Sequence, residues 1–330
     1  MDNLTHGLLG AAVGALRRPD GAALSATDRA TLLACLGAAE LPDLDTLLPS
    51  ENPALHDLQA HRGLSHSLLF APVVALVATV LARLVFRGAR PGPVFLFSLL
   101  ATLFAHLLPD LWTGWGTRIL LPFSDARLAL DWTLVVDPFV TLPLLAGAVW
   151  AWRRRHTGAW RRALLVGFGV SALYVGTRVA VRAALHDTVK ETYPAARSIA
   201  VFPTWVGLGT WRYVAQLPDG YAVGEVRPLQ PPAEQHRVPL PSPDALPPEL
   251  LAVPTVREAL AWARFPVVEL RGQQVRVADL RYHLRGQPTL TFVIDLEPAG
   301  SGFSVRSARL ERGGSAQELL KRWRGQQSRP

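Results

Sequence analysis

The chain has 330 residues, of which 49% are hydrophobic and only 18% charged, and its mean hydropathy is +0.20. An ordinary soluble domain carries roughly 25% charged residues, so the composition excludes a disordered chain and a simple soluble enzyme. The net charge of +8 comes almost entirely from arginine. The single cysteine, Cys35, excludes a disulfide framework and a cysteine-based zinc site, so any metal site must use nitrogen and oxygen ligands.

Four apolar stretches are predicted to span a membrane, which takes about 20 helical residues. They cover residues 67–86, 93–109, 133–152 and 161–181. Two shorter stretches, 4–16 and 30–41, are predicted as short helices that line the others. The composition changes near residue 182. We therefore expect an all-α polytopic membrane bundle over residues 1–182 and a second domain over residues 183–330.

The arginines of the predicted bundle fall in short connections on one side, as at residues 83–90 and 153–162, and the acidic residues gather on the other side. The positive-inside rule makes the arginine side cytoplasmic. The acidic end and the second domain are then extracytoplasmic. Because topology accounts for the basic charge, we expect the lipid bilayer as a partner and no nucleic acid.

The second domain changes to strand character. WRYVAQL and YAVGEVRPL, separated by PDG, predict a β-hairpin, and later segments add strands with alternating or β-branched residues. Residues 228–254 are rich in proline and predict an extended linker or insertion. Helices are expected near residues 255–264 and 315–324, which completes a small α+β domain.

Histidines and aspartates gather at the acidic end of the predicted bundle. Ionisable side chains at membrane depth are costly, so several of them at one level indicate a functional site. The candidate metal ligands are His6, Asp43, Asp45, His61, His66, His106 and Asp110.

The spacing of these residues supports a metal site. His106 and Asp110 are four residues apart at the end of a predicted span, so they share one helix face. Asp43 and Asp45 follow a proline, and in an extended turn residues two apart point to the same side and could bridge metals. Histidine and aspartate ligands suit divalent zinc, with manganese as the alternative.

Five motifs carry a resemblance to a known family: MDNLTHGLLGAAVG, LPDLDTLLP, HRGLSHSLLF, HLLPDLWTGWGTRILLPFSD and ALDWTLVVDP. The chain resembles, from residue 1 to about residue 180, the YdjM-like family of bacterial inner-membrane, metal-dependent hydrolases. The resemblance implies a multi-pass protein of the bacterial inner (cytoplasmic) membrane.

A fainter similarity is to zinc-dependent phospholipase C and related single-strand nucleases. It implies that the metal ligands are His6, Asp43 or Asp45, His61 or His66, and His106 with Asp110. The sequence has no later His/His/Glu set for a third ion. Asp131 and Asp137 would have to substitute, so one or two ions are expected.

These features together predict hydrolysis of phosphoester bonds in a membrane-associated substrate, such as a lipid-linked phosphoester. Arg62 and Asp45 are the candidate catalytic residues, with Arg62 as the cation that meets the phosphate group. One alternative is a transporter or ion-binding permease, whose site should lie near the midplane of the membrane. The other is a non-catalytic scaffold with a structural metal, whose ligand shell should be closed.

Overall fold

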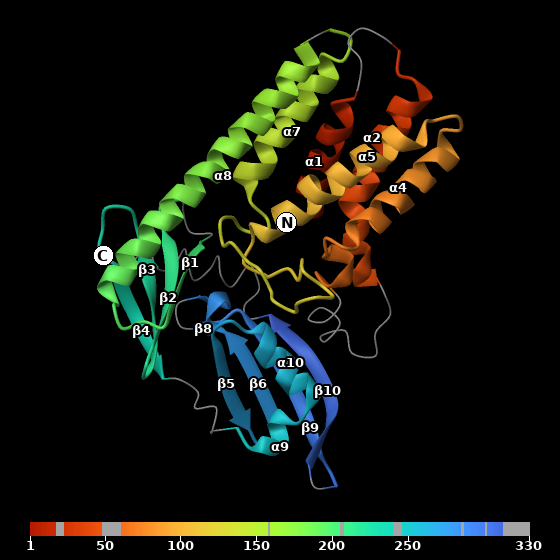
Figure 1. Ribbon diagram of the computed structural model, residues 1–330. Helices are drawn as coiled ribbons and strands as arrows, with labels where there is room; N and C mark the ends of the chain where they lie inside the picture. Colours follow the sequence, from red (N-terminus) through yellow and green to blue (C-terminus); the bar gives the residue numbers. More distant parts are fainter. Residues whose placement is uncertain are drawn as a thin grey trace. The chain divides into compact units, whose positions relative to one another are not determined.

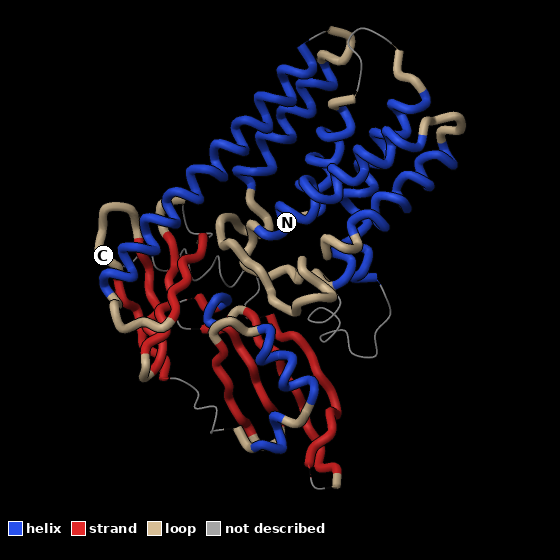
Figure 2. Tube along the Cα trace, viewed as in Figure 1, coloured by secondary structure: helices blue, strands red, loops and turns tan. Residues whose placement is uncertain are grey.

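The computed structural model describes residues 1–17, 23–47, 61–157, 159–204, 208–239, 246–284, 287–300 and 302–312. The chain folds into two compact units, of which the first is largely helical and the second is rich in strands (Figures 1 and 2). The first unit comprises Met1–Leu48, Ala60–Leu185 and Phe202–Thr210, and the second comprises Pro49–Gln59, His186–Val201 and Trp211–Pro330.

The helices of the first unit are, in chain order, α1 (Asn3–Ala15), α2 (Ala26–Glu40), the 3-10 helices η1 (Leu41–Leu47) and η2 (Leu64–His66), α4 (Ala71–Val85), α5 (Pro91–Ala101), the π-helical segment η3 (Thr102–Leu107), α6 (Leu108–Leu111), α7 (Pro138–Arg153) and α8 (Ala159–Thr192). Segments α5, η3 and α6 form one continuous helix over Pro91–Leu111. Small residues let these helices approach closely. A Cβ atom on Gly167 of α8, for example, would lie 2.6 Å from the carbonyl oxygen of Pro143 in α7.

The prediction of a four-span bundle is wrong. Among the described residues, two helices are long and apolar enough to cross a membrane, Pro91–Leu111 and Ala159–Thr192. The predicted spans 67–86 and 133–152 contain helices of only 15 and 16 residues, α4 and α7. In both cases the helix begins several residues after the apolar stretch does. Residues Ser67–Phe70 form a turn before α4, and α7 begins only after its N-cap Asp137.

The strands of the second unit are β1 (Ser198–Pro203), β2 (Trp211–Leu217), β3 (Gly220–Val226), β4 (Ala233–Pro239), β5 (Pro266–Arg271), β6 (Gln274–Asp279), β7 (His283–Leu284), β8 (Gln287–Pro288), β9 (Leu290–Ala299) and β10 (Gly302–Arg312). Strands β1-β2-β3-β4 form one four-stranded sheet and β10-β9-β6-β5 form another. The prediction of a single small α+β domain is therefore corrected to two four-stranded sheets, accompanied by a two-stranded sheet of β7 and β8 and the helices α9 (Pro248–Leu251) and α10 (Pro254–Trp262).

The predicted hairpin is confirmed, since β2 and β3 pair antiparallel around the Pro218–Gly220 turn from Trp211↔Val226 to Leu217↔Gly220. The proline-rich segment 228–254 is not only a linker. Its residues Ala233–Pro239 form β4, which pairs with β3. Its residues 240–245 and the helix predicted at 315–324 lie outside the described residues.

Candidate metal centre

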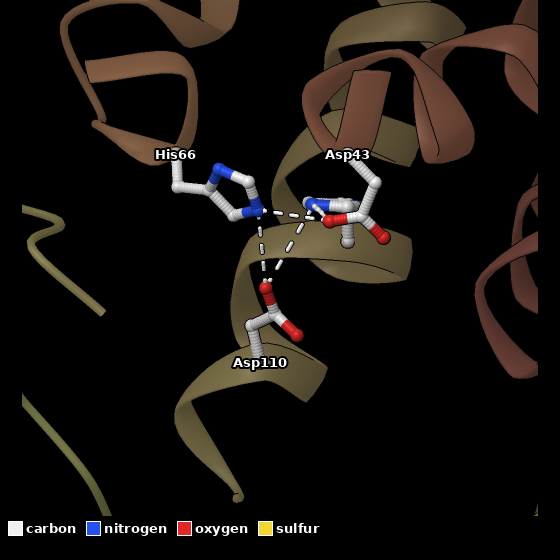
Figure 3. Close-up of side chains that lie close together, drawn as sticks. Asp43, His66 and Asp110 are labelled. Atoms are coloured by element: carbon white, nitrogen blue, oxygen red, sulfur yellow. Dashed lines mark hydrogen bonds and ion pairs between the residues drawn. The ribbon is translucent and has the colours of Figure 1, made fainter. Parts of the chain in front are cut away.

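Four segments that are far apart in the sequence meet in the helical unit. They are the start of α1, η1, the turn at residues 61–66, and the end of the long helix Pro91–Leu111. The 3-10 helix η1 follows directly on α2, where Pro42 has no N–H to continue the α-helical pattern. Figure 3 shows the side chains of Asp43, His66 and Asp110 turned toward one another.

Three imidazoles and two carboxylates converge there. His66 Nε2 lies 3.2 Å from Asp43 Oδ1 and 3.3 Å from Asp110 Oδ2. His106 Nε2 lies 3.7 and 3.8 Å from the same two oxygens, and His6 Nε2 lies 3.4 Å from Asp110 Oδ1. Donors bound to zinc at about 2.1 Å in a tetrahedron are about 3.4 Å apart. Asp43, His66, His106 and Asp110, with ligand atoms within 4.8 Å of one another, could therefore hold one metal ion.

The other ring nitrogens of His6 and His106 contact backbone carbonyls. His6 Nδ1 lies 2.7 Å from the carbonyl oxygen of Ala105, and His106 Nδ1 lies 2.7 Å from that of Ala39. Because a carbonyl only accepts hydrogen bonds, each Nδ1 carries the proton and donates it. Each Nε2 is then unprotonated, which is the form of imidazole that binds a metal.

Both carbonyls are available because a helix is interrupted next to them. The carbonyl of Ala39 belongs to the last turn of α2, where helical N–H partners run out. The carbonyl of Ala105 would pair with the N–H of residue 109 in an α-helix, but Pro109 has none. The surrounding segment η3 is π-helical, with the N–H of Leu108 bonded to the carbonyl of Leu103. Such wide turns often occur at functional sites.

The ligand atoms are buried, and a buried polar atom without a hydrogen-bond partner destabilises the fold. The side chains of His6, His66 and His106 are completely buried. Three buried atoms of the described cluster have no hydrogen-bond partner: His6 Nε2, His106 Nε2 and Asp110 Oδ2. Buried polar atoms are nearly always paired. One cation held by Asp43, His66, His106 and Asp110 would give His106 Nε2 and Asp110 Oδ2 a partner, so these residues fit a metal ion. His6 lies beside them, with its Nε2 next to Asp110 Oδ1.

Asp45 lies on the opposite side of the His66 ring. Its carboxylate is 3.4 Å from His66 Nδ1 and 3.0 Å from His61 Nδ1, and it accepts a hydrogen bond of 2.5 Å from the Ser65 hydroxyl. Burial raises the pKa of Asp45, but the bonds to His61, His66 and Ser65 outweigh it and hold the pKa well below its usual range. A carboxylate on the far nitrogen of a metal-binding histidine fixes its tautomer and orientation.

The surroundings of His66 favour a positive charge. Burial lowers the pKa of this imidazole, but its close contacts with Asp110, Asp43 and Asp45 raise the pKa to about 10. A metal ion bound at Nε2 would take the place of that proton and face the carboxylates of Asp43 and Asp110. Metal binding that displaces a proton weakens in acid.

Arg62 is buried and already has partners within the protein. Its Nη2 lies 2.8 Å from Asp110 Oδ1, and its Nη1 donates to the Thr113 hydroxyl at 2.7 Å and to the Asp110 carbonyl at 3.3 Å. The Met1 ammonium group contacts the same Oδ1. Arg62 also has a φ of 58°, a left-handed conformation that costs about 1 kcal/mol or more. These contacts hold Asp110 with its Oδ2 toward His66 and His106.

The structure separates the candidate ligands into two groups. Those that converge are His6, Asp43, His66, His106 and Asp110. Asp45 and His61 lie behind His66 and contact each other. Asp43 and Asp45 therefore approach opposite nitrogens of one ring and do not meet at a shared point.

The aspartates considered as substitutes have other contacts. Asp131 forms an ion pair with Arg182, and Asp137 caps α7 and accepts a hydrogen bond from Tyr174. Sequence reasoning did not identify the carbonyls of Ala39 and Ala105 as partners of the ligands. Pro109 was the available signal, because a proline inside a helix leaves a carbonyl unpaired.

Comparisons with known proteins identify the family. The YdjM inner membrane protein family matches residues 1–185, which contain all the residues of the cluster. The uncharacterized protein YfhP of Bacillus subtilis is 26% identical over 329 residues, which cover 93% of this chain and 94% of YfhP. The inner membrane protein YbcI of Escherichia coli is 35% identical over 150 residues, which cover 38% of this chain and 84% of YbcI.

No solved structure shows significant similarity to the chain. The family match spans more than half of the sequence and confirms the resemblance of the five motifs. The chain belongs to the YdjM inner membrane protein family.

Proposed function

We propose that this protein is a membrane-bound, metal-dependent hydrolase that acts on phosphoester bonds of a membrane-associated substrate. The observation that carries the proposal is the set of three buried, unpartnered atoms, His6 Nε2, His106 Nε2 and Asp110 Oδ2, within one cluster of donors. A buried cluster of this kind at the end of an apolar helix is expensive to maintain without a function.

The donor types favour zinc, with manganese as the alternative. Imidazole nitrogen suits zinc, whereas a site for magnesium or calcium would be built from oxygen ligands. We assign His6, His66 and His106 as the nitrogen ligands through Nε2 and Asp43 and Asp110 as the oxygen ligands. A bound zinc ion lowers the pKa of a coordinated water toward neutrality and stabilises the negative charge that develops on a phosphate.

The remaining residues of the cluster position the ligands. Asp45, from its place behind His66, holds the Nδ1 proton on the far side of the ring, so that Nε2 is the nitrogen turned to the ion. Arg62 holds Oδ1 of Asp110 and leaves Oδ2 for the ion. Its positive charge next to the ligands also favours an anionic substrate.

The arginines that precede the two candidate spans support an orientation. Arg83, Arg87 and Arg90 come before the helix that starts at Pro91, and the arginines at 153–155 and 161–162 surround the start of α8. By the positive-inside rule both helices begin in the cytoplasm. The metal centre, at the carboxyl end of the first of them, would then be extracytoplasmic.

A second candidate function is a scaffold with a structural metal. It is favoured by the number of donors, because three imidazoles and two carboxylates could close the coordination shell and leave no position for water. We rank it second because Asp43 is partly exposed, so solvent reaches one side of the cluster.

The test uses the full chain, purified in detergent. Elemental analysis before and after treatment with a chelator measures bound metal, and release of phosphate or headgroup is measured on lipid phosphoesters with zinc or manganese added. We expect about one or two ions per chain and hydrolysis that the chelator abolishes. His106→Ala should lose both, and His186→Ala, a substitution of a partly exposed histidine on α8, should lose neither. A folded, metal-loaded protein that cleaves no phosphoester in a broad panel would favour the scaffold.

A further inference from the structure

Exposed leucines border the accessible side of the metal centre. They are Leu44 and Leu47 on η1 and Leu64, Leu68 and Leu69 in the turn around η2, and we call them the leucine rim. Each is between 48% and 75% exposed. The least buried side chains of the polar cluster, Asp43 at 13% and His61 at 21%, belong to the same two segments.

In these segments the apolar residues are exposed and the charged residues are buried, which is the opposite of a turn that faces water. Within residues 61–70 the exposed positions are Leu64, Leu68 and Leu69, whereas the charged Arg62 and His66 are buried. In η1 the carboxylates of Asp43 and Asp45 both turn to the cluster, while Leu44 and Leu47 are exposed. A turn that faced water would carry polar residues at its exposed positions and would bury the apolar ones.

The leucine rim is followed in the chain by a helix that also exposes leucines. Ala71 begins α4 directly after the turn, and α4 exposes Leu76, Leu81 and Leu84, each by more than half. Isolated exposed leucines are normal on a protein surface, but so many on segments that contact one another indicate a lipid or protein interface. The chain belongs to a family of inner membrane proteins and contains two helices able to cross a bilayer, so lipid is the partner that this surface fits.

We propose that the leucine rim inserts among the acyl chains of one leaflet, so that the metal centre takes an amphiphilic substrate directly from the bilayer. The rim would hold acyl chains while the polar headgroup reaches the partly exposed Asp43 and the histidine and aspartate ligands next to it. This inference rests on the proposed function for its substrate, but the position of the rim in the leaflet does not depend on hydrolysis.

Spin labels can test the position of the rim because the chain has a single cysteine, Cys35, which is buried. In a Cys35→Ala background, Leu47→Cys, Leu64→Cys and Leu69→Cys are each labelled in vesicles of phosphatidylethanolamine and phosphatidylglycerol. Electron paramagnetic resonance then compares collisions of each label with oxygen, which concentrates in the bilayer, and with a water-soluble nickel chelate.

Two exposed leucines serve as references. Leu173→Cys lies on the candidate span α8, at 73% exposed, and Leu270→Cys lies on β5 of the second unit, at 43% exposed. We expect the oxygen-to-nickel ratio at the three rim positions to approach that of residue 173 and to exceed that of residue 270 several-fold. Ratios at the rim that equal the ratio at residue 270 would overturn the proposal.

A second measurement tests the substrate. The double variant Leu47→Ser, Leu64→Ser should lose most of its hydrolysis of a phospholipid in vesicles and keep its rate on a soluble aryl phosphoester. An equal loss on both substrates would contradict lateral entry from the leaflet. If the wild-type protein cleaves neither substrate, the proposed function fails, whereas the spin-label ratios still decide where the rim lies.

Discussion

His6 Nδ1 lies 2.7 Å from the carbonyl oxygen of Ala105, a residue 99 positions away in the sequence. In an α-helix this carbonyl would accept from the N–H four positions later, but that residue is Pro109, which has none, and the histidine takes the place of the missing donor. One proline thus connects the geometry of the long helix Pro91–Leu111 to the protonation state of a candidate ligand on α1.

Replacing Pro109 with alanine should therefore weaken metal binding. The new N–H at position 109 would compete for the carbonyl of Ala105 and release the ring of His6. Loss of such an outer contact typically lowers metal affinity by roughly 10- to 100-fold. Competition with a coloured chelator measures the affinity. Pro143→Ala, a change at the proline inside α7, is the matched control and should have no effect. Equal affinities in both variants would show that His6 does not need Ala105.

The candidate ligands themselves give a direct prediction. His106→Ala and Asp110→Ala should each lower the bound metal, because each removes a donor from the cluster. Membrane insertion should persist, since it depends on the apolar helices. Elemental analysis of membrane-extracted protein checks both points. Asp125→Ala, at an aspartate that is 87% exposed, is the control for Asp110. Unchanged metal content in both ligand variants would mean that the pair is polar packing only.

The apolar stretches of the sequence predicted the locations of the helices correctly, but they predicted the lengths of the helices less well. The stretches 93–109 and 161–181 lie within helices long enough to cross a membrane, but α4 and α7 are shorter than their apolar stretches. A hydropathy window counts apolar residues in turns as well as in helices. In the second unit, the PDG turn predicted the β2–β3 hairpin. The prolines around Ala233–Pro239 led instead to the prediction of a linker or insertion where the structure has β4. Proline is tolerated there because β4 is at the edge of its sheet.

The spacing of His and Asp residues predicted which segments meet, but not how each side chain points. We expected Asp43 and Asp45 to share a side because residues two apart do so in an extended turn. The segment is a 3-10 helix with about three residues per turn, so the two carboxylates diverge and contact opposite nitrogens of His66. The contacts to the carbonyls of Ala39 and Ala105 depend on tertiary packing of α1, α2 and η3, which no local pattern encodes.

The buried side chain of His283 should lower the free energy of unfolding of the protein in acid. It is 6% exposed, and neither of its ring nitrogens has a hydrogen-bond partner among the described residues. Burial, together with the charges of Arg212 and His236, lowers its pKa to about 4. Folding therefore favours the neutral ring. Its contribution is complete above the unfolded pKa of about 6.5 and is lost as the pH falls toward 4, by about 3 kcal/mol at most.

Denaturant unfolding of the full chain in detergent, followed by the β-sheet band of circular dichroism, measures this loss at pH 7 and pH 4.5. His283→Leu should reduce the difference between the two pH values, because leucine does not titrate. His156→Leu, at an exposed position between α7 and α8, should leave it unchanged. The same pH difference in the His283 variant and the wild type would assign the acid sensitivity to other groups.

Variants of Arg62 can show whether this residue positions Asp110 or contacts the substrate directly. The sequence alone suggested that Arg62 meets the phosphate, and on that basis Arg62→Ala should abolish turnover and retain the metal. In the structure its Nη atoms bind Asp110 and Thr113. We therefore expect Arg62→Lys to lower metal affinity, by roughly 10-fold, because a lysine is a point charge that cannot bridge the two residues.

Metal affinity and kcat measured on the same preparations decide between the two roles. Thr113→Val removes one partner of Arg62 without changing the charge, and its metal affinity should fall less than that of Arg62→Lys. Arg62→Ala removes one of the two buried cationic partners of Asp110 and leaves the Met1 ammonium group, so this variant should also unfold more easily. If Arg62→Lys keeps full metal affinity while kcat falls, Arg62 acts on the substrate and does not serve to position Asp110.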